Sequence, residues 1–457
     1  MKTAWEKYTG SKVKTVMDFC EEYKSFLDAS KTERESVTTS IQIARKSGFK
    51  DFKDIKTIKP GDKIYFNNRG KSLALFVIGK NPIESGLNIL GAHIDSPRVD
   101  VKQVPLYEDN GLVLLDTHYY GGIKKYQWVA HPMALHGVVC KKDGKKIEIA
   151  LGEKQSDPVI EFSDLLIHLA QDQMQKSGSK VVEGEDLNAL FGSIPKSSTK
   201  KDDSDLVKKN ILDLLKKNYG IEEDDFISAE LEIVPAGKAR DLGLDRSMIM
   251  GYGHDDRICA YTSLKALVDS KNLNRTCVCI LTDKEEIGSV GNTGAHSQFF
   301  ENCVAELINM QDKYSDLKLR HALENSAMLS SDVSAAFDPN YPQVNEKKNC
   351  AYFGKGIVFN KFTGSRGKSG SNDAHAEFLA KVRKVMDDNK VVFQTSELGK
   401  VDQGGGGTIA YVLAEKNMDV LDAGIAVQNM HACYETASKV DIYEAYLAYK
   451  AFLKDLK

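Results

Sequence analysis

The first part of the chain combines helical and strand-like hydrophobic patterns. Apolar residues recur every three or four positions over residues 14–31 and again over residues 33–47, which predicts two helices. Short apolar runs follow, separated by glycine and Asn-Pro pairs that predict turns. The strands expected from these runs are residues 63–66, 73–78 and 87–90.

Residues 101–230 have a different pattern, in which polar and apolar positions alternate. The runs at residues 111–115 and 146–150 have the period of two that predicts half-exposed strands of an antiparallel sheet. Residues 196–205 (KSSTKKDDSD) are too polar to pack, so we expect an exposed loop there.

One segment inside this region has helical spacing instead. Over residues 162–175, the side chains of Leu165, Leu166 and Leu169 fall on one side of a helix. The spacing therefore predicts an amphipathic helix that buries these three leucines.

Beyond about residue 233, continuous apolar runs alternate with helical patterns. Helical spacing covers residues 257–267 and 373–387. Continuous apolar runs between helices are typical of parallel strands that are covered on both faces. The buried strands expected here are residues 276–281, where Cys277 and Cys279 share one face, and residues 304–309, 326–330, 356–360 and 391–394.

These patterns predict an α/β fold with a mostly parallel central sheet flanked by helices. A single hydrophobic core rarely serves 457 residues, so we expect two domains. Residues 1–100 and 240–457 are expected to form one α/β domain from both ends of the chain. Residues 101–239 are expected to form an inserted β-rich domain.

Composition and charge narrow the class of protein. Hydrophobic residues make up 42% of the chain and charged residues 28%, with a net charge of −3 and both signs interspersed. No basic stripe or acidic tail is present, which argues against nucleic-acid and membrane-surface binding. No stretch approaches the roughly 20 apolar residues that span a bilayer, and the first residues lack the apolar core of a signal peptide. None of the eight cysteines forms a C-x-x-C motif, so we expect reduced thiols and a cytoplasmic protein.

Two glycine-containing segments resemble nucleotide-binding motifs only superficially. Residues 364–369 (GSRGKS) resemble the end of a phosphate-binding loop, but Phe362 stands where that motif needs glycine five positions before Gly367. The four glycines at residues 404–407 lack dinucleotide-binding spacing, and we expect them to allow a close backbone approach that lines a substrate cleft.

The candidate chemistry lies at the predicted ends of strands. Most of the acidic and histidine side chains that stand out directly follow a predicted strand, and the carboxyl ends of strands in α/β sheets converge on the ligand crevice. Singly, such motifs are more often a hydrogen-bonded pair, a solvated face or a helix cap. Their order and placement together indicate a metal site. The segments are GAHIDSP at 91–97, GHDD at 253–256, DKEEIGS at 283–289, SSD at 330–332 and QNMH at 428–431.

The residue types match a two-metal centre. Two divalent ions about 3.5–4 Å apart need a bridging carboxylate and, for each ion, a histidine and a further carboxylate. Glu285, next to a ligand, is expected to point away from it along an extended backbone and to act as a general base. Asp95 is placed to hold the second imidazole nitrogen of the neighbouring histidine. The five expected ligands are His93, Asp255, Glu286, Asp332 and His431.

The chain resembles the aspartyl aminopeptidase family of co-catalytic zinc peptidases over essentially its whole length. The resemblance rests on the first three of the segments above together with THYYGG at 117–122, SSDVSAAFDPNYP at 330–342, GGGGTIA at 404–410 and NMHACYE at 429–435. The resemblance implies that His93 and Asp332 hold one zinc ion and that Glu286 and His431 hold the other. It implies Asp255 as the bridge and Glu285 as the base. The expected cofactors are thus two divalent ions, zinc first, with cobalt or manganese as alternatives.

The resemblance also implies an assembly. Members of this family form tetrahedral dodecamers, so the insertion at residues 101–239 is expected to be an oligomerisation domain. His168 matches a histidine that reaches into a neighbouring subunit's active site. Acid-specific members carry a basic residue in the segment matching residues 354–361, where Asn360 and Lys361 are both candidates. Preference for acidic N-terminal residues therefore stays open.

The expected function is a metallo-aminopeptidase that releases N-terminal residues from small peptides. A carboxypeptidase or acyl-amino-acid hydrolase on the same scaffold is an alternative, and would need an arginine clamp, for which Arg98 and Arg366 are available. A catalytically silent scaffold or cargo protein is a second alternative. The presence of Glu285 argues against it, because a site that had lost its function would not need a base.

Overall fold

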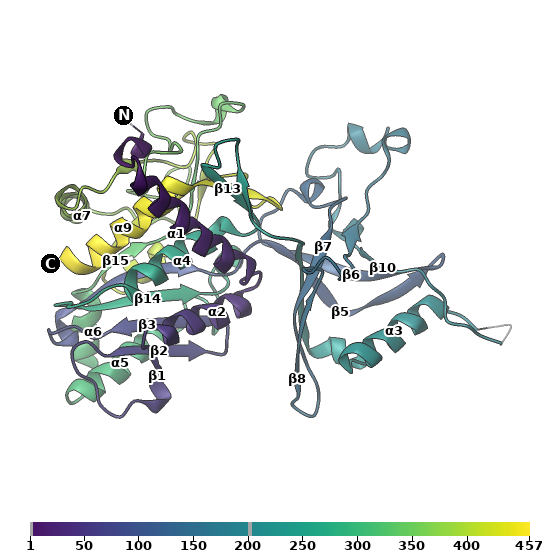
Figure 1. Ribbon diagram of the computed structural model, residues 1–457, viewed down its shortest axis with the longest axis horizontal. Helices are drawn as coiled ribbons and strands as arrows, with labels where there is room; N and C mark the ends of the chain where they lie inside the picture. The colour runs from purple at the N-terminus through teal and green to yellow at the C-terminus, as the bar shows by residue number, and fades with distance from the viewer. Residues whose placement is uncertain (1–2, 200–202) are drawn as a thin grey trace. The chain divides into compact units, whose positions relative to one another are not determined.

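The computed structural model describes residues 3–199 and 203–457 (Figure 1). The chain divides into two compact units, each with its own sheet. The first unit comprises residues 3–96, 239–430 and 435–457, and the second comprises the described part of residues 97–238 together with residues 431–434.

A nine-stranded sheet forms the centre of the first unit. Its four central strands, β14, β4, β15 and β21, run parallel to one another. The α/β class with a mostly parallel sheet is thereby confirmed. The strands in spatial order are β1 (Lys50–Asp51), β2 (Lys63–Asn68), β3 (Ser72–Val77), β14 (Thr276–Thr282), β4 (Leu87–His93), β15 (Ala327–Ser330), β21 (Asp419–Gly424), β17 (Ile357–Asn360) and β19 (Phe393–Thr395).

Helices cover both faces of this sheet (Figure 1). Alternate residues of β14 join different cores: Cys277 and Cys279 pack in one cluster, while Val278 and Ile280 pack in the other. The predicted shared face of the two cysteines is confirmed. The helices that contribute to the cysteine side are α1 (Ser11–Asp28), α2 (Glu33–Lys46), α4 (His254–Val268), α7 (Ala376–Asp388) and α9 (Lys439–Asp455). Those of the other side are α5 (Phe299–Gln311), α6 (Asp316–Glu324) and α8 (Ala410–Ala414).

Two smaller sheets complete the first unit. A two-stranded ladder of β18 (Gly364–Ser365) and β20 (Gly405–Gly406) joins the two glycine-containing segments. A Cβ atom at Gly405 would lie 2.2 Å from the carbonyl oxygen of Gly364, so the expected close backbone approach is present. The other sheet consists of β12 (Arg240–Leu242), β13 (Met248–Gly251), β23 (Glu435–Ser438), β22 (Ala426–Gln428) and β16 (Ser334–Ala335).

The second unit is β-rich, as its alternating pattern predicts. Every ladder of its seven-stranded sheet is antiparallel. Helix α3 (Leu206–Tyr219) belongs to the same unit. The strands in spatial order are β8 (Lys146–Leu151), β7 (Met133–Cys140), β11 (Ala229–Pro235), β5 (Arg98–Asp109), β6 (Leu112–Tyr120), β10 (Ala189–Gly192) and β9 (Glu161–Phe162).

The helix expected over residues 162–175 does not form. Beyond β9 the chain makes only two short 3-10 turns, Ile167–Leu169 and Gln173–Gln175. The carboxylate of Asp164 accepts hydrogen bonds from the Leu165 backbone N–H and the Gln173 side chain, and local bonds of this kind compete with a helix. The leucines that the pattern was expected to bury are exposed: Leu165 by 52%, Leu166 by 55% and Leu169 by 69%.

A second expectation was also wrong. Residues 304–309 lie inside helix α5 and not in a strand, because Val304, Leu307 and Ile308 form the buried face of a 13-residue amphipathic helix. A short apolar run does not by itself distinguish a buried strand from part of a helix. Within the predicted polar loop at 196–205, residues 200–202 are outside the described part, and the others lie outside helices and strands.

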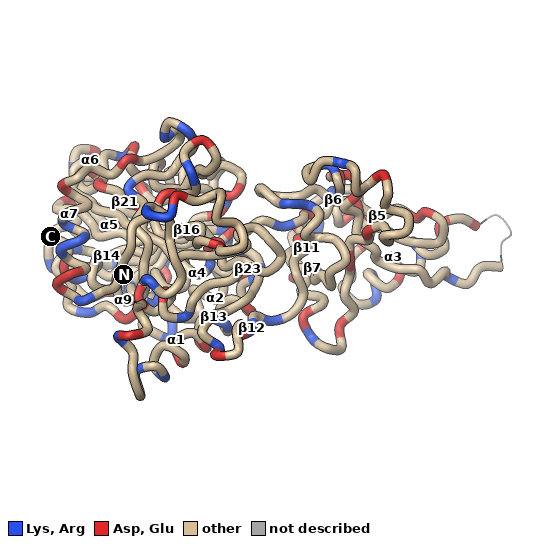
Figure 2. Tube along the Cα trace, turned by 90° about the horizontal axis from the view of Figure 1, so that it is seen from above, with Lys and Arg blue, Asp and Glu red and all other residues tan. Residues whose placement is uncertain are grey.

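The distribution of charged residues and the state of the cysteines agree with what the sequence predicts. Lysine and arginine residues are interspersed with acidic residues along the chain of each unit (Figure 2). All eight cysteines are free thiols, as expected. Among the helices of the described chain, none combines the length and the apolar character that a membrane span requires.

Candidate metal centre

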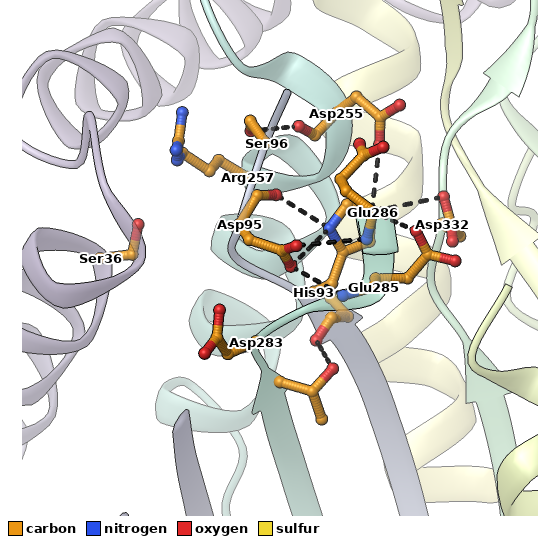
Figure 3. A network of polar contacts seen from close by, with 12 residues as sticks. Ser36, His93, Asp95, Ser96, Asp255, Arg257, Asp283, Glu285, Glu286 and Asp332 are labelled. Carbon is orange, nitrogen blue, oxygen red and sulfur yellow. Dashed lines mark hydrogen bonds and ion pairs between the residues drawn. The ribbon is translucent and has the colours of Figure 1, made fainter. Parts of the chain in front are cut away.

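Three parallel strands deliver acidic and histidine side chains to one edge of the central sheet. His93 is the last residue of β4, and Thr282, the last residue of the adjacent β14, is its register partner. On the other side of β4, β15 ends at Ser330, two residues before Asp332. The close view of this edge shows the side chains converging on His93 (Figure 3).

The imidazole of His93 is at the centre of the cluster. Its Nδ1 lies 2.9 Å from the carbonyl oxygen of Asp95, which accepts the Nδ1 proton in the neutral tautomer. In that tautomer Nε2 carries the lone pair, and its neighbours are carboxylate oxygens that favour a proton or a cation on Nε2: Asp255 Oδ1 at 3.1 Å, Asp332 Oδ1 at 3.9 Å and Glu285 Oε2 at 4.0 Å. The residue is 1% exposed, so these groups surround the ring away from bulk water.

Asp95 connects the histidine to the pair of glutamates. Its buried carboxylate accepts the backbone N–H of Glu285 at 3.1 Å and that of Glu286 at 3.2 Å. One oxygen also lies 3.4 Å from His93 Nδ1. The carboxylate therefore orients the turn that carries both glutamates, in addition to lying at the second imidazole nitrogen.

The two glutamates are in a 3-10 turn, Glu285–Ile287, and not in the extended backbone expected from the sequence. The turn begins after Lys284, whose φ of 69° is left-handed. The Glu285 side chain remains 16% exposed, so a carboxylate beside the histidine stays accessible to water.

Asp255 is held from both sides of its backbone. It is in the first turn of α4, and its N–H donates to Glu435 Oε2 at 3.0 Å. The hydroxyl of Ser96 donates to its carbonyl oxygen. Ser96 lies within GAHIDSP and Glu435 within NMHACYE, but neither was identified as a site residue from the sequence. Both bond the backbone of Asp255 and not the side chain of an expected ligand.

A further buried acid, Asp256, lies within the cluster and was also missed. Ligand atoms of His93, Asp256 and Asp332 lie within 4.8 Å of one another, and those of His93, Glu285 and Glu286 do the same. The adjacent Asp-Asp pair is typical of a helix cap, so its second member carried no separate signal.

Electrostatics indicate that this cluster needs positive charge. Burial raises the pKa of Asp332 well above its usual value, and the charge of Asp256 raises it further. Burial lowers the pKa of His93, but hydrogen bonds with the Asp255 and Asp95 carboxylates outweigh burial and raise it overall. Clustered, desolvated carboxylates beside an imidazole fit a divalent cation by charge and by ligand type.

Gly424 determines where the backbone of Asp332 can lie. A Cβ atom at Gly424 would be 1.6 Å from the Asp332 carbonyl oxygen and 2.5 Å from its carbonyl carbon. Only glycine permits this approach of β21 to the Asp332 segment.

The remaining two predicted residues belong to the second unit. His431 follows β22 by three positions, has a φ of 67°, and its Nδ1 lies 2.7 Å from the Gly122 carbonyl oxygen. That contact leaves Nε2 as the atom with a lone pair, as in His93. His168 is exposed in the 3-10 turn Ile167–Leu169.

The chain is similar to known proteins over nearly its whole length. A family model described as aminopeptidase I zinc metalloprotease (M18) matches residues 26–453. A probable M18 family aminopeptidase 1 from Clostridium acetobutylicum is 58% identical, over 99% of this chain and 98% of that protein. The crystal structure of an M18 family aminopeptidase from Thermotoga maritima has a TM-score of 0.96 at 44% identity, covering 100% and 99% of the two chains. The S. cerevisiae mApe1 dodecamer, 22% identical with a TM-score of 0.76 over 96% and 97% of the chains, shares the fold.

Proposed function

This chain belongs to the M18 family of aminopeptidase I zinc metalloproteases, and we propose on this basis that its carboxylate-rich centre holds two divalent cations and uses Glu285 as a general base. The chain is a zinc-dependent metallo-aminopeptidase, and the predicted family resemblance is confirmed. The observation that carries the proposal is the Nε2 atom of His93, buried and facing three carboxylates.

The donor set suggests a division between the two ions. His93 and Asp332 are proposed to hold one, since their ligand atoms are in one group. Glu286 and His431 are proposed to hold the other, with Asp255 bridging. The support for His431 is its orientation, because the Gly122 carbonyl oxygen occupies Nδ1 and leaves Nε2 for a ligand bond.

When bound, such cations supply Lewis acidity that acidifies a water molecule and polarises the scissile carbonyl. Glu285 is proposed to accept the proton of that water and to hand it to the departing amine. Asp95 orients this base through the Glu285 backbone N–H, and it keeps Glu286 in the same turn.

Membership of a family described as aminopeptidases favours an aminopeptidase over a carboxypeptidase. A carboxypeptidase would need an arginine for the terminal carboxylate of its substrate. Arg98 is already engaged by Asp100 at 2.8 Å and Glu232 at 3.3 Å, and Arg366 lies in an exposed hairpin turn. The proposed substrates are therefore small peptides with a free N-terminus.

The proposed function can be tested with paired substrates. A panel of aminoacyl fluorogenic substrates would be assayed with zinc, cobalt and manganese in turn, beside the same substrates carrying an N-acetyl cap. Turnover of the free amines with release of N-terminal residues is expected. Preferential turnover of the capped compounds would favour the acyl-amino-acid hydrolase instead. Because the panel varies the N-terminal side chain, it also decides the preference for acidic residues.

We further propose that the second unit is an oligomerisation domain and that the protein forms a homo-oligomer, with a tetrahedral dodecamer as the expected form. The exposed apolar residues around His168 support this, because a monomer rarely leaves such a group uncovered. They are Leu165, Leu166, Ile167 and Leu169. The eight free thiols are consistent with the proposed location in the reducing cytoplasm.

We propose that His168 steadies the oxyanion or the scissile carbonyl of a neighbouring subunit's site. His168→Phe is therefore expected to lower kcat by at least about 10²-fold, the usual scale for losing one transition-state donor. Oligomer size should stay unchanged because phenylalanine can pack among the exposed apolar residues of the proposed interface, and metal content should stay unchanged because His168 is not one of the proposed metal ligands. Steady-state kinetics, light scattering and metal analysis would be measured on the same sample.

A mixture of His168→Phe and Glu285→Gln subunits tests whether His168 acts in a neighbour's site. If it does, some mixed interfaces pair an intact Glu285 with an intact His168, and activity partly returns. If it acts within its own subunit, every site carries one defect. Absence of complementation after demonstrated subunit exchange would exclude the shared site.

A further inference from the structure

Behind the turn that carries Glu285, three charged side chains from three different elements meet in the interior of the first unit. Glu33 is the first residue of α2, Lys71 lies between β2 and β3, and Asp283 directly follows β14. The Lys71 Nζ atom lies 3.0 Å from Glu33 Oε1 and 3.8 Å from Asp283 Oδ2. Their side chains are 0%, 14% and 1% exposed for Glu33, Lys71 and Asp283.

Stability alone is a weak reason for such a group. Taking charges out of water carries a desolvation cost that can exceed the attraction between them, and well-packed apolar residues of similar volume often give a protein of equal stability. A buried group of three charges is better explained if one of its carboxylates must occupy a fixed position to bond another part of the active site. Of the three residues, Asp283 belongs to residues 283–293, the loop that carries Glu285 and Glu286.

Asp283 closes the loop that carries the proposed base and ligand. Its N–H donates to the Thr293 carbonyl oxygen at 3.3 Å, and Thr293 Oγ1 donates back to Asp283 Oδ2 at 2.7 Å. Thr293 is 2% exposed, so water does not compete for this bond. Asn68 Nδ2 also donates to the Asn292 carbonyl oxygen at 2.8 Å. The two ends of residues 283–293 are thereby fixed together.

We propose that Lys71 is a positioning residue for Glu285. Its ammonium group balances the buried Asp283 carboxylate, which can then stay in place and accept the Thr293 hydroxyl. The closed loop, together with the hydrogen bonds to Asp95, determines where the Glu285 carboxylate lies relative to His93. The inference rests on the proposed role of Glu285 as the base. It adds that a residue outside the metal cluster, Lys71, helps to fix the position of that base.

Lys71→Met is expected to lower kcat by about 10–100-fold, the scale that a misplacement near 1 Å produces, while KM and metal content stay within about 2-fold. Lys63→Met is the matched control. Lys63 is also a partly buried lysine, in the neighbouring strand β2; its Nζ donates to the carbonyl oxygens of Ser47 and Val268, and among the described residues it forms no ion pair with a carboxylate. It should lose stability and keep kcat within about 2-fold of the wild type.

A rescue separates positioning from packing. In the triple variant Glu33→Gln/Lys71→Met/Asp283→Asn, the amide oxygen introduced at position 283 can still accept the Thr293 hydroxyl, and neither of the two buried carboxylates that face Lys71 is left without its ammonium partner. Recovery of at least half of the lost kcat on a logarithmic scale is expected. A role limited to packing of the lysine stem would show no recovery and would overturn the proposal.

Thr293→Val provides the test if Lys71→Met does not fold, because it removes one hydroxyl at nearly constant volume. It should lower kcat by about 10-fold with metal content retained. An unchanged kcat in Thr293→Val, or a Lys71→Met effect no larger than that of Lys63→Met, overturns the inference. Glu285→Gln assayed in parallel distinguishes the two levels. An active Glu285→Gln enzyme would refute the proposed role of Glu285 as the base. If Glu285→Gln is inactive, the Thr293 and Lys71 variants test the positioning role of Lys71 separately.

Discussion

Glu285→Gln is expected to retain its metal and lose nearly all turnover. Glutamine keeps the shape of the side chain and the backbone N–H that Asp95 holds, but it cannot accept a proton at neutral pH. Loss of a general base typically costs about 10²–10⁴-fold, and a centre that depends on it to activate water can lose more. Metal content by mass spectrometry and kcat would be determined on one preparation.

The neighbouring residue supplies the control for this variant. Glu286→Gln changes the same functional group one position along the turn, but it is expected to remove a ligand. It should lower metal content together with kcat, whereas Glu285→Gln lowers kcat alone. A Glu285→Gln enzyme with near-normal kcat would refute the role assigned to Glu285.

Asp255→Ala is expected to empty the centre more completely than His93→Ala or His431→Ala. A bridging carboxylate neutralises both cations, while each histidine serves one. The Asp255 side chain is 5% exposed and its Oδ1 is 3.1 Å from His93 Nε2, so water does not readily replace it. Zinc per subunit after dialysis, together with kcat, would be compared across the three variants.

The outcome for Asp255 is informative in both directions. Retention of about half the metal in the histidine variants, with almost none in Asp255→Ala, supports the bridge, because each histidine serves one of two ions. Equal metal loss in all three would mean that Asp255 serves a single ion. Circular dichroism would accompany each variant, because Glu435 and Ser96 also bond the Asp255 backbone and should keep α4 in place.

The strands that carry the site could be predicted from the sequence because their signals are local. Residues 276–281 and 326–330 are continuous apolar runs bounded by polar residues, and both are strands of the parallel sheet. The failures are also physical. Residues 304–309 (VAELIN) are also rich in apolar residues, but they belong to a 13-residue amphipathic helix whose period shows only over its full length. Leu165, Leu166 and Leu169 have helical spacing but remain exposed, because no packed surface in the described part of their unit covers them.

Part of the site follows from the sequence for a related reason. In a parallel sheet, residues that directly follow strands meet at one edge, so His93 and Asp332 could be grouped from the order of strands alone. Residues that act through backbone atoms give no such signal. Glu435 accepts the backbone N–H of Asp255, and Thr293 closes a loop by donating to Asp283. Nothing in the sequence distinguishes these two residues from other buried polar residues.

By itself the sequence determined the class of fold, the β-rich character of the second unit and the family, because hydrophobic period and short motifs depend on consecutive residues. Tertiary structure alone decided the rest. It determined that Asp95 bonds two backbone N–H groups, that Gly424 lies against Asp332, and that Lys71 reaches Asp283 from a distant part of the chain. Such contacts depend on distances between elements far apart in the chain, and no local pattern specifies those distances.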